Sequence, residues 1–600
     1  MSLGSSYICT STKDLQTQYS RDFPYIKAAK GKNNFPCLLK QDFIDNGSYQ
    51  CGICASDNAN ECYHTNVEYG PCMTNEFFKG DGCKYRTFAK DYKISNEGTK
   101  EEEIHIDNDS KHNYQKQYSG WLPISNLNVR REWKPCEYFN QLNIALASSH
   151  SIFNYSIFLA FLPYNKSLDE RELLVLDEGH LLETEIVKFR GLSISKRRWK
   201  RYIDNLEITD YGYDDIERWI DFLIDLETKM LVATDNRSLA ELLAIKRNVK
   251  YDYCKERKEE EAAAAAKRYC NNKNRIVSAS ELFDSDYEIE KKYAFDDEVL
   301  KKSTKTLGEE LAVDAIKDTE RLTRTINSIL LNPKNWIISE IKKDNYKVDK
   351  LELKPLDISS YCKSVFEKGS KVLIMSATIL NDKAFCKSIG LGPDEVKFIQ
   401  IKSDFPVEHR AIYPLNIAYL NYSNLQSLDT KAKISRAVDN LMSMYKNDKG
   451  IIHTTSYEQL TFIKDNISKE NARRLLITDP EIQRDEVVFQ HTSTKKPTVL
   501  ISPSLHTGLD LKDELSRFQI ITKVPYPSKG DRWTNAKRES DEEWYYWQTA
   551  LRLIQAYGRS IRSKDDWAKT YILDSAFSYF IKKNRNMLPD WFIQAIKGHV

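Results

Sequence analysis

Short runs made up mostly of apolar residues recur along this chain, separated by stretches in which apolar residues return every three or four positions. The runs lie at residues 173–176, 371–375, 450–453, 498–501 and 518–521. Continuous apolar runs of this length are typical of strands buried on both faces of a parallel sheet. Together with the helical stretches between them, they predict an α/β fold built on parallel sheets.

A different pattern fills residues 188–350, which are rich in charge and helical in spacing. Apolar residues fall on one helical face at Trp199, Tyr202, Ile203 and Leu206, and again at Ile216, Trp219, Ile220, Leu223 and Ile224. This spacing predicts a helical insert. Within it, residues 259–268 combine glutamates, alanines and a basic pair, and are predicted to form a solvated helix without a functional role.

Length, charge and composition narrow the class of protein. At about 150 residues per domain, the chain has room for roughly four domains. Its 89 basic and 87 acidic side chains leave a formal charge of +2, so any nucleic-acid contact has to come from local patches or backbone donors. The first residues lack the features of a signal peptide, and no apolar stretch is long enough to span a bilayer. A soluble protein of the cell interior is expected, cytoplasmic or, in a eukaryote, nuclear.

Half of the cysteines are concentrated near the amino end of the chain. Six of the 12 lie within one 47-residue window, at Cys37, Cys51, Cys54, Cys62, Cys72 and Cys83. Even spacing would place about one there. Because long apolar runs are absent around them, a small domain in this window needs a metal or another staple to fold. The clustering favours a metal site over buried, unliganded thiols.

Charged residues follow the apolar run at 173–176 directly. The chain continues Asp177-Glu178-Gly179-His180, and ligands of parallel sheets bind at the carboxyl ends of strands. In phosphoryl transfer from a nucleotide, Asp177 would hold Mg²⁺ and Glu178 would orient the attacking water. The alternative is an ordinary strand-to-helix junction, with Asp177 as the helix N-cap and the next side chains solvated.

Two weaker signals lie later in the chain. Ser376 and Thr378 follow the run at 371–375 and place two hydroxyls at a strand end, where such residues are often plain caps. Gln555, Arg559 and Arg562 are spaced for one helical face. Arginine suits phosphate oxygens, although a solvated charged face explains this spacing as well.

Taken together, these segments resemble the successive motifs of superfamily 2 helicases. The matching segments are TSTKDLQTQ at 10–18, DEGH at 177–180, MSATIL at 375–380, SPSLHTGLD at 502–510, KVPYP at 523–527 and QAYGRSIR at 555–562. Their order is similar to that of the XPD/DinG branch, the iron-sulfur DNA helicases. The resemblance implies an α/β protein with two RecA-like parallel-sheet motor domains, the first carrying a Cys-rich iron-sulfur insert and a helical, arch-like insert.

The resemblance also implies roles for single residues. Asp177 and Glu178 would hold Mg²⁺ and promote hydrolysis of ATP, and His180 would couple them to the second motor domain. Three further groups are implied: Ser376 and Thr378 for coupling to strand movement; Gly508, Asp510, Gln555, Arg559 and Arg562 facing the nucleotide; and Thr10, Thr12 and Gln18 toward the DNA. Gly179 replaces the more usual Ala, a small-for-small change expected to matter little. Thr507 replaces a commonly acidic residue, which weakens the role of that position.

For the cysteine window, the resemblance implies a 4Fe-4S cluster. Cys37 looks like its first ligand and Cys136 like its last. Cys72 and Cys83 are preferred as the middle pair, and the rival choices are the remaining cysteines of the window, Cys51, Cys54 and Cys62. An additional zinc site is open to the surplus ligands Cys51, Cys54, Cys62 and His64.

One family feature is missing from these 600 residues. The family binds the β- and γ-phosphates of ATP with a Gly-rich loop, set between a strand and a helix ahead of the Thr-rich motif. No G-x-x-x-x-G-K-[ST] segment occurs in the sequence. Truncation upstream of Met1 is the preferred explanation, because the residues that serve hydrolysis remain in place. A natural variant that does not hydrolyse ATP by the usual route is the alternative.

The sequence thus predicts an ATP-dependent DNA helicase that moves along single-stranded DNA and unwinds forked DNA in repair or replication. The resemblance implies 5′ to 3′ polarity. A single-stranded nucleic-acid-binding scaffold without ATPase activity is the alternative; no membrane contact is expected, and protein partners are left open. The expected domains are motor domain one at 1–35, 140–187 and 351–382, the Cys-rich domain at 36–139, the helical insert at 188–350 and motor domain two at 383–600.

Overall fold

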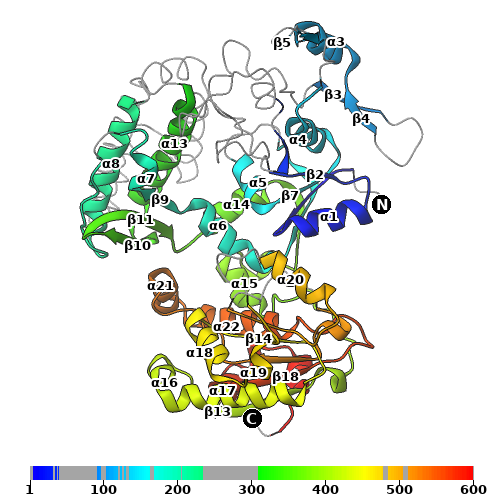
Figure 1. Cartoon of the computed structure of the whole chain (residues 1–600). Helices are drawn as coiled ribbons and strands as arrows, with labels where there is room; N and C mark the ends of the chain where they lie inside the picture. The colour runs from blue at the N-terminus through cyan, green and yellow to red at the C-terminus, as the bar shows by residue number, and fades with distance from the viewer. Residues whose placement is uncertain are drawn as a thin grey trace. The chain divides into compact units, whose positions relative to one another are not determined.

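The computed structural model describes residues 4–31, 34–36, 38, 91–95, 103–118, 122–124, 127–129, 134–162, 168–203, 206–233, 309–477, 484–503 and 511–598. The chain divides into two compact units, Met1–Met375 and Ser376–Val600, whose elements are labelled in Figure 1. The domain boundaries expected from the sequence stay predictions.

A five-stranded sheet forms the centre of the first unit. Its order is β12 (Gly369–Met375), β8 (Arg171–Asp177), β1 (Ser6–Thr10), β7 (His150–Asn154) and β2 (Lys27–Ala29), and every pairing is parallel. The helices of this part are α1 (Lys13–Asp22), α4 (Glu137–Ala147), α5 (Tyr155–Phe161), α6 (Leu182–Arg190) and α14 (Ser359–Phe366). The runs at 173–176 and 371–375 are therefore strands, as predicted.

A buried arginine ties the central strands of this sheet together. Arg171 begins β8, and its guanidinium donates to the carbonyl of Ser6 at 2.7 Å and to the hydroxyl of Ser151 at 2.9 Å. It also lies 3.9 Å from the centre of the Tyr7 ring. These contacts satisfy a charge that would otherwise be costly to bury, so β1, β7 and β8 are held in one register.

The insert between β8 and β12 combines helices with a second sheet. Its helices are α7 (Lys196–Trp199), α8 (Ile216–Ala233) and α13 (Glu309–Leu331), and its antiparallel sheet has the order β10 (Trp336–Asp344), β11 (Lys347–Pro355), β9 (Leu192–Ser195). The predicted helical face is buried in one core that includes Trp199, Trp219 and Leu223. The helical prediction is confirmed for α8. It is wrong for the first face, because α7 ends at Trp199 and Tyr202, Ile203 and Leu206 follow outside any helix. Helical spacing also did not reveal the sheet. Residues 259–268 lie outside the described residues.

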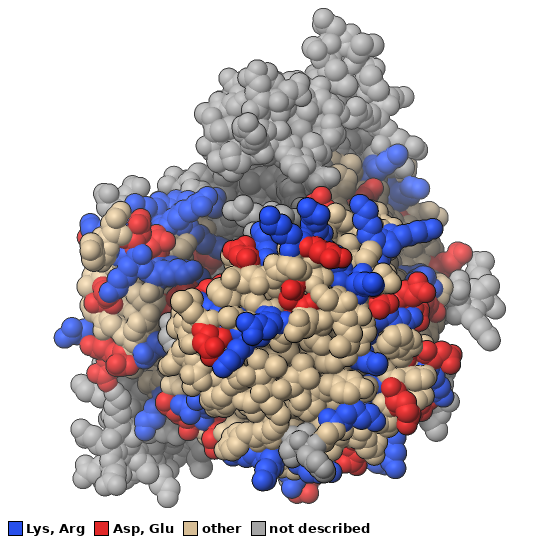
Figure 2. Space-filling model, turned by 60° about the horizontal axis from the view of Figure 1, so that its bottom comes forward, with Lys and Arg blue, Asp and Glu red and all other residues tan. Residues whose placement is uncertain are grey.

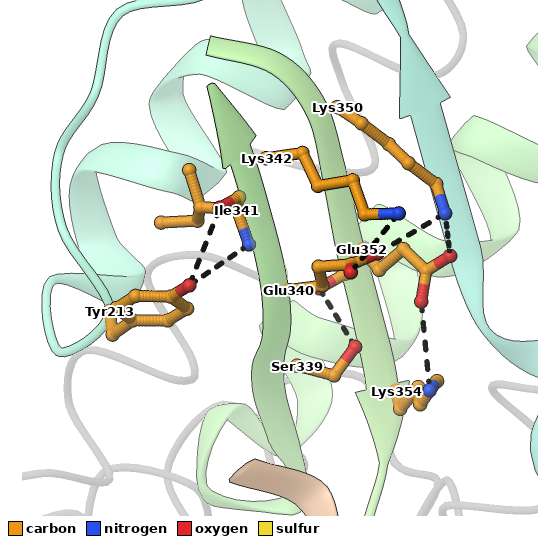
Figure 3. Close-up of polar contacts among 8 residues, drawn as sticks. All are labelled: Tyr213, Ser339, Glu340, Ile341, Lys342, Lys350, Glu352 and Lys354. Atoms are coloured by element: carbon orange, nitrogen blue, oxygen red, sulfur yellow. Dashed lines mark hydrogen bonds and ion pairs between the residues drawn. The ribbon is translucent and has the colours of Figure 1, made fainter. Parts of the chain in front are cut away.

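Charged side chains connect the strands of this small sheet (Figure 3). Lys350 of β11 lies 3.2 Å from Glu340 of β10 and 2.5 Å from Glu352 on its own strand. The hydroxyl of Tyr213 accepts from the backbone amide of Ile341 at 3.2 Å. These side chains are partly exposed, and ion pairs near the surface contribute little to stability. Leu351 and Leu353 of the same strand are buried in the apolar core.

Short elements lie between β2 and β7, in the stretch that contains the cysteine window. They are β3 (Tyr92–Ser95) paired with β4 (Glu103–Ile106), α3 (Asn108–Tyr118), and β5 (Leu122–Ile124) paired with β6 (Leu127–Val129).

The second unit is built on a six-stranded parallel sheet. The order is β13 (Ile412–Ala418), β18 (Lys569–Asp574), β17 (Phe518–Ile521), β14 (Gly450–His453), β16 (Val499–Ser502) and β15 (Leu475–Ile477). The helices are α15 (Asp382–Ser388), α16 (Tyr422–Gln426), α17 (Leu428–Met444), α18 (Tyr457–Asn466), α19 (Lys469–Ala472), α20 (Arg484–Ser493), α21 (Arg532–Ser540), α22 (Glu542–Tyr557), α23 (Ala576–Lys583) and α24 (Asp590–Ala595).

The fold-class prediction of two parallel-sheet α/β units is confirmed. The predicted strands at 450–453, 498–501 and 518–521 are β14, β16 and β17, and their residues are buried. Figure 2 shows basic and acidic side chains interspersed on the face that it displays, in keeping with the net charge of +2. Among the described residues, no helix is long and apolar enough to cross a membrane.

Candidate nucleotide and coupling sites

The carboxyl ends of the first unit's strands meet at one edge of its sheet. Thr10 pairs with Asn154, and Met375 pairs with Asp177. Cys9, one residue before Thr10, pairs with Leu176. This edge is where parallel α/β sheets bind ligands, so the candidate site begins with the residues that follow β8.

Asp177 is held by two hydrogen bonds. Its Oδ2 accepts from the hydroxyl of Tyr19 at 3.1 Å, and its Oδ1 accepts from the backbone amide of Glu178 at 2.9 Å. Partial burial raises the pKa of Asp177, and the two hydrogen bonds oppose that shift. Each carboxylate oxygen keeps a lone pair for a further partner. A carboxylate of this kind suits Mg²⁺, whose charge would favour the ionised form.

Glu178 adopts a backbone conformation that residues other than glycine rarely use. Its φ is +53° and its ψ is +42°, the left-handed region, and such outliers concentrate at functional sites. Oε2 of Glu178 lies 3.2 Å from Nδ1 of the buried His180. The helical turn after β8 has Glu178, not Asp177, at its N-cap position, and no side-chain cap bond. The alternative interpretation of Asp177 as a helix cap is therefore wrong.

Gly179 lies against strand β12. A Cβ atom on this residue would sit 2.2 Å from Cγ2 of Ile374, far inside the ordinary contact distance of about 3.5–4.0 Å. The expectation that alanine and glycine are interchangeable here is wrong, because the close approach of the two segments leaves no room for a methyl group.

The three predicted DNA-facing residues have different surroundings. Thr10 is buried, and its hydroxyl donates to the carbonyl of Thr12 at 3.3 Å. Thr12 caps α1 by accepting from the amide of Leu15 at 3.3 Å. Gln18 is exposed on α1. Both threonines thus have local structural partners, while Gln18 is open to a ligand, and the DNA role of all three stays a prediction.

In the second unit the structure brings the predicted coupling residues next to α22. The amide of Thr378 donates to Oγ of Ser376 at 3.0 Å, and Nε2 of Gln555 donates to Oγ1 of Thr378 at 3.5 Å. Nε1 of Trp547 donates to the carbonyl of Ile379 at 2.8 Å. Segment 376–380 is therefore attached to α22 at two places.

The two predicted nucleotide arginines do not share a helical face with Gln555. Helix α22 ends at Tyr557, so Arg559 and Arg562 follow it in irregular structure. Nε of Arg559 turns back to donate to the carbonyl of Gln555 at 3.0 Å, and the guanidinium thereby takes up one of the last carbonyls of the helix. Arg562 is exposed. The helical-face prediction is wrong, because Gly558 ends the helix.

Most of the predicted metal ligands and two predicted nucleotide residues lie outside the described residues. Gly508 and Asp510 lie outside the described residues, as do Cys37, Cys72 and Cys83 and the rival ligands Cys51, Cys54, Cys62 and His64. Cys136 is buried and immediately precedes α4. Among the described ranges, no three His, Cys, Asp or Glu side chains are grouped to hold a metal ion. The cluster ligand set stays a prediction.

Sequence reasoning missed three supporting side chains. Tyr19 bonds the carboxylate of Asp177, the hydroxyl of Tyr155 donates to its carbonyl at 2.8 Å, and Trp547 bonds segment 376–380. All three are aromatic residues whose partners are distant in sequence. Their spacing in the sequence indicates only positions on the buried face of a helix, so no local signal identifies their role.

Parts of the chain are similar in sequence to known proteins. Residues 440–595 match the family described as the helicase C-terminal domain. The ATP-dependent DNA helicase DinG of Photobacterium profundum is 25% identical over 40% of this chain and 36% of its own length. The Fanconi anemia group J protein homolog of Gallus gallus is 27% identical over 25% of this chain and 13% of its own. Regulator of telomere elongation helicase 1 of Mus musculus is 31% identical over 16% of this chain and 9% of its own length.

The matched segments thus span about a third or less of these relatives. Among solved structures, one titled XPD_Helicase aligns with 98% of this chain and 90% of its own at a TM-score of 0.48 and 15% identity. The motif resemblance is confirmed by the family and relative matches: the chain is similar to superfamily 2 helicases of the XPD/DinG type.

Proposed function

We propose that this protein, as an XPD/DinG-like chain, is an ATP-dependent DNA helicase. It would move 5′ to 3′ along single-stranded DNA and unwind forked substrates in repair or replication. It would act in the cytoplasm or, in a eukaryote, in the nucleus. The helicase C-terminal domain at 440–595 and the named DNA helicases among the relatives support the proposal. The observation that carries it is the pair Asp177 and Glu178 at the carboxyl end of a central parallel strand.

The arrangement of these side chains suits metal-assisted hydrolysis of a nucleotide. Asp177 would take a place in the shell of Mg²⁺, which neutralises the charge that develops on the phosphates during transfer. Tyr19 and the amide of Glu178 fix the orientation of the Asp177 carboxylate. The left-handed backbone of Glu178 directs its side chain away from a regular helical path. Glu178 would orient the attacking water, and His180 would hold Glu178.

Coupling to DNA movement is proposed for segment 376–380. Gln555 bonds Thr378 directly, so a displacement of the Gln555 side chain is passed to the two hydroxyls of Ser376 and Thr378. Arg559 is bonded to the carbonyl of Gln555, so a phosphate that attracts Arg559 would pull on the same helix end. Arg562 is exposed, and rotation of its side chain would bring its guanidinium toward a charged ligand.

A single-stranded nucleic-acid-binding scaffold is the second candidate. It is favoured by one observation, the lack of a Gly-rich Lys-Ser/Thr loop within these 600 residues. In that case the protein would bind single strands by stacking and backbone contacts and would not hydrolyse ATP.

The experiment that separates the two candidates is ATP hydrolysis with and without single-stranded DNA, on this chain and on the chain extended by any upstream coding sequence. Asp177→Asn is the test variant, and Asp169→Asn, an exposed carboxylate eight residues earlier in the sequence, is the matched control. DNA-stimulated hydrolysis that only Asp177→Asn abolishes supports the motor. Tight DNA binding without hydrolysis in either form supports the scaffold.

The cofactor proposal is a 4Fe-4S cluster held by Cys37, Cys72, Cys83 and Cys136. Cysteine thiolates are the ordinary ligands of such clusters, and the burial of Cys136 beside the start of α4 fits a ligand that is shielded from oxidation. Iron and sulfide are counted on protein purified without oxygen. About four of each, lost in Cys136→Ser, is the expected result; stoichiometric zinc without iron would contradict it.

A further inference from the structure

One segment of the insert concentrates positive charge. Residues 188–203 contain seven basic residues and no acidic one, although the charge of the whole chain is only +2. The seven are Lys188, Arg190, Lys196, Arg197, Arg198, Lys200 and Arg201. Five of them lie in the short helix α7 or directly after it. A local patch of this kind is what a nearly neutral chain needs in order to attract a polyanion.

The core of the insert holds this helical turn in place. Ser195 caps α7 by accepting from the amide of Arg198 at 3.3 Å, and Trp199 and Tyr202 are buried in the core. The guanidinium of Arg198 donates two hydrogen bonds to the carboxylate of Asp318, at 2.7 and 2.8 Å. Arg198 therefore has a structural partner, and it helps to fix the turn that carries the other basic residues.

The remaining four basic side chains form what we call the basic turn: Lys196, Arg197, Lys200 and Arg201. Lys196 is partly buried and the other three are exposed, and none of the four forms an ion pair with a described acidic residue. The helical path continues past α7, because the amide of Lys200 donates to the carbonyl of Lys196 at 3.0 Å. Residues four apart on such a path are neighbours, and like charges at this spacing are destabilising.

Lysines elsewhere in the insert are offset by carboxylates. Ion pairs of 2.5–3.3 Å join three of them to acidic residues: Lys229 to Asp225, Lys343 to Asp210 and Lys347 to Glu207. On β10 and β11, lysines and glutamates likewise lie in contact (Figure 3). The basic turn differs, because its charges repel one another and no described carboxylate offsets them. Such a surface fits a ligand that itself brings the negative charge.

The surroundings of the basic turn distinguish between different polyanions. A surface that binds lipid presents aromatic and apolar side chains beside its lysines, and a protein interface is anchored by exposed aromatic residues. The aromatic residues next to these charges, Trp199 and Tyr202, are only 1% and 6% exposed. Contacts to a phosphate backbone need only charges and donors, and the planar fork of arginine fits phosphate oxygens. The basic turn therefore favours a nucleic-acid backbone.

We propose that the basic turn binds the phosphate backbone of DNA without reading its sequence. The choice of DNA rests on the proposed function, whereas the charge and exposure of the turn do not. The predicted DNA-facing residues Thr10, Thr12 and Gln18 lie far from this segment in the sequence, so the basic turn is an additional contact, made by the insert. Neutralising four phosphates of a single strand releases about three condensed counterions, at roughly 0.7 for each phosphate.

Salt titration of DNA binding, without ATP, tests this contact. The test variant changes the basic turn to glutamine: Lys196→Gln, Arg197→Gln, Lys200→Gln and Arg201→Gln. The control removes the same charge from four ion-paired lysines of the insert: Lys229→Gln, Lys342→Gln, Lys343→Gln and Lys347→Gln.

The affinity of residues 1–600 for oligothymidine is measured over a range of salt concentrations. We expect the test variant to lower the affinity about tenfold or more at low salt, and to reduce the slope of log K against log[salt] by about 3. The control should leave both quantities nearly unchanged. Equal changes in the two variants, or no change in the test variant, would overturn the proposal. Repetition with duplex DNA shows which form is preferred, since four contacts to a duplex change the slope by about 3.6.

A single substitution guards against loss of folding. Arg197→Gln alters one exposed side chain and should leave the melting temperature within about 2 °C. It should reduce the salt slope by about 0.7, whereas Lys229→Gln should not. An unchanged slope in Arg197→Gln, in a protein that melts normally, would contradict the contact.

Two further probes test the other polyanions. Vesicles of phosphatidylserine and phosphatidylcholine represent a membrane, and polyglutamate represents an acidic protein. We expect the test variant to lose affinity for DNA and to bind neither probe differently from the parent. Binding to vesicles or polyglutamate that the test variant abolishes, with DNA affinity unchanged, would assign the basic turn to that ligand and overturn the proposal.

The contact and the proposed function can fail independently. Loss of DNA affinity in the test variant of a protein that shows no DNA-stimulated ATP hydrolysis would support the contact and refute the motor. DNA-stimulated hydrolysis together with unchanged DNA affinity in the test variant would support the motor and refute the contact.

Discussion

Substitution of Gly179 by alanine tests how closely the acidic turn after β8 is packed on β12. The new Cβ would lie 2.2 Å from Cγ2 of Ile374 and 3.5 Å from the carbonyl oxygen of Met375. The second distance is an ordinary contact and the first is not. Either Ile374 rotates out of its preferred rotamer, or the turn that carries Glu178 and His180 moves away from the sheet.

The magnitude follows from two opposing effects. Overpacking of this kind costs about 1–3 kcal/mol. Replacing glycine by alanine also raises the free energy of unfolding by about 0.4–1 kcal/mol, because alanine lowers the conformational entropy of the unfolded chain. This gain applies here because the φ of Gly179 is not in the left-handed region that disfavours alanine. The middle values of these two ranges give a net loss of about 1.3 kcal/mol, which corresponds to roughly tenfold in the local unfolding equilibrium.

Hydrogen exchange of β8 amides measures this loss in the first unit directly, since unfolding of a chain with two units is not one transition. Gly31→Ala is the control, because its Cβ would meet nothing closer than 3.7 Å. Ile374→Ala removes the clashing atom, so the double variant should regain most of the loss. Unchanged exchange in Gly179→Ala, or a double variant no better than the sum of the two single variants, would refute the packing argument.

Three further predictions concern single side chains. Tyr19→Phe removes a hydrogen bond that lowers the pKa of Asp177, so the acid limb of the pH–rate profile for ATP hydrolysis should move to higher pH. Tyr155→Phe is the control: it loses only a hydrogen bond to a backbone carbonyl and should leave that limb in place. Trp547→Phe keeps an aromatic ring but removes the hydrogen bond to segment 376–380. The stimulation of ATP hydrolysis by DNA should therefore fall several-fold, while the affinity for DNA is retained. An equal loss of stimulation and of DNA affinity would contradict a coupling role. Burial lowers the pKa of His491 to about 4, so His491 binds a proton in the unfolded chain at a higher pH than in the folded one. The free energy of unfolding of the second unit should therefore be constant above about pH 6.5 and fall by up to about 3 kcal/mol toward pH 4. His491→Gln should flatten that dependence in urea titrations across the same pH range.

The two parallel sheets could be predicted from the sequence because an apolar run indicates a buried strand by itself, without knowledge of its neighbours. β14, β16 and β17 are short segments made up mostly of apolar residues, and this pattern is local. The acidic turn after β8 was found for the same reason: its residues follow a buried strand directly in the chain.

The remaining features depend on partners distant in sequence. The bond from Tyr19 to Asp177 spans 158 residues and that from Trp547 to Ile379 spans 168, so spacing alone shows neither. The end of α22 at Tyr557 was missed because Gly558 lies inside an apparently continuous periodic pattern, and glycine both continues and ends helices. The clash at Gly179 depends on the neighbouring strand, which is supplied by residues almost 200 positions later in the chain.

The central proposal is that this protein is an ATP-dependent motor that unwinds DNA. Its most direct test is ATP-dependent strand displacement from a forked duplex with a 5′ single-stranded tail, compared with a duplex that has only a 3′ tail, on this chain and on the chain extended by any upstream coding sequence. We expect displacement from the 5′-tailed fork alone, abolished in Asp177→Asn and retained in Asp169→Asn. Binding of both substrates without displacement of either strand would contradict the claim.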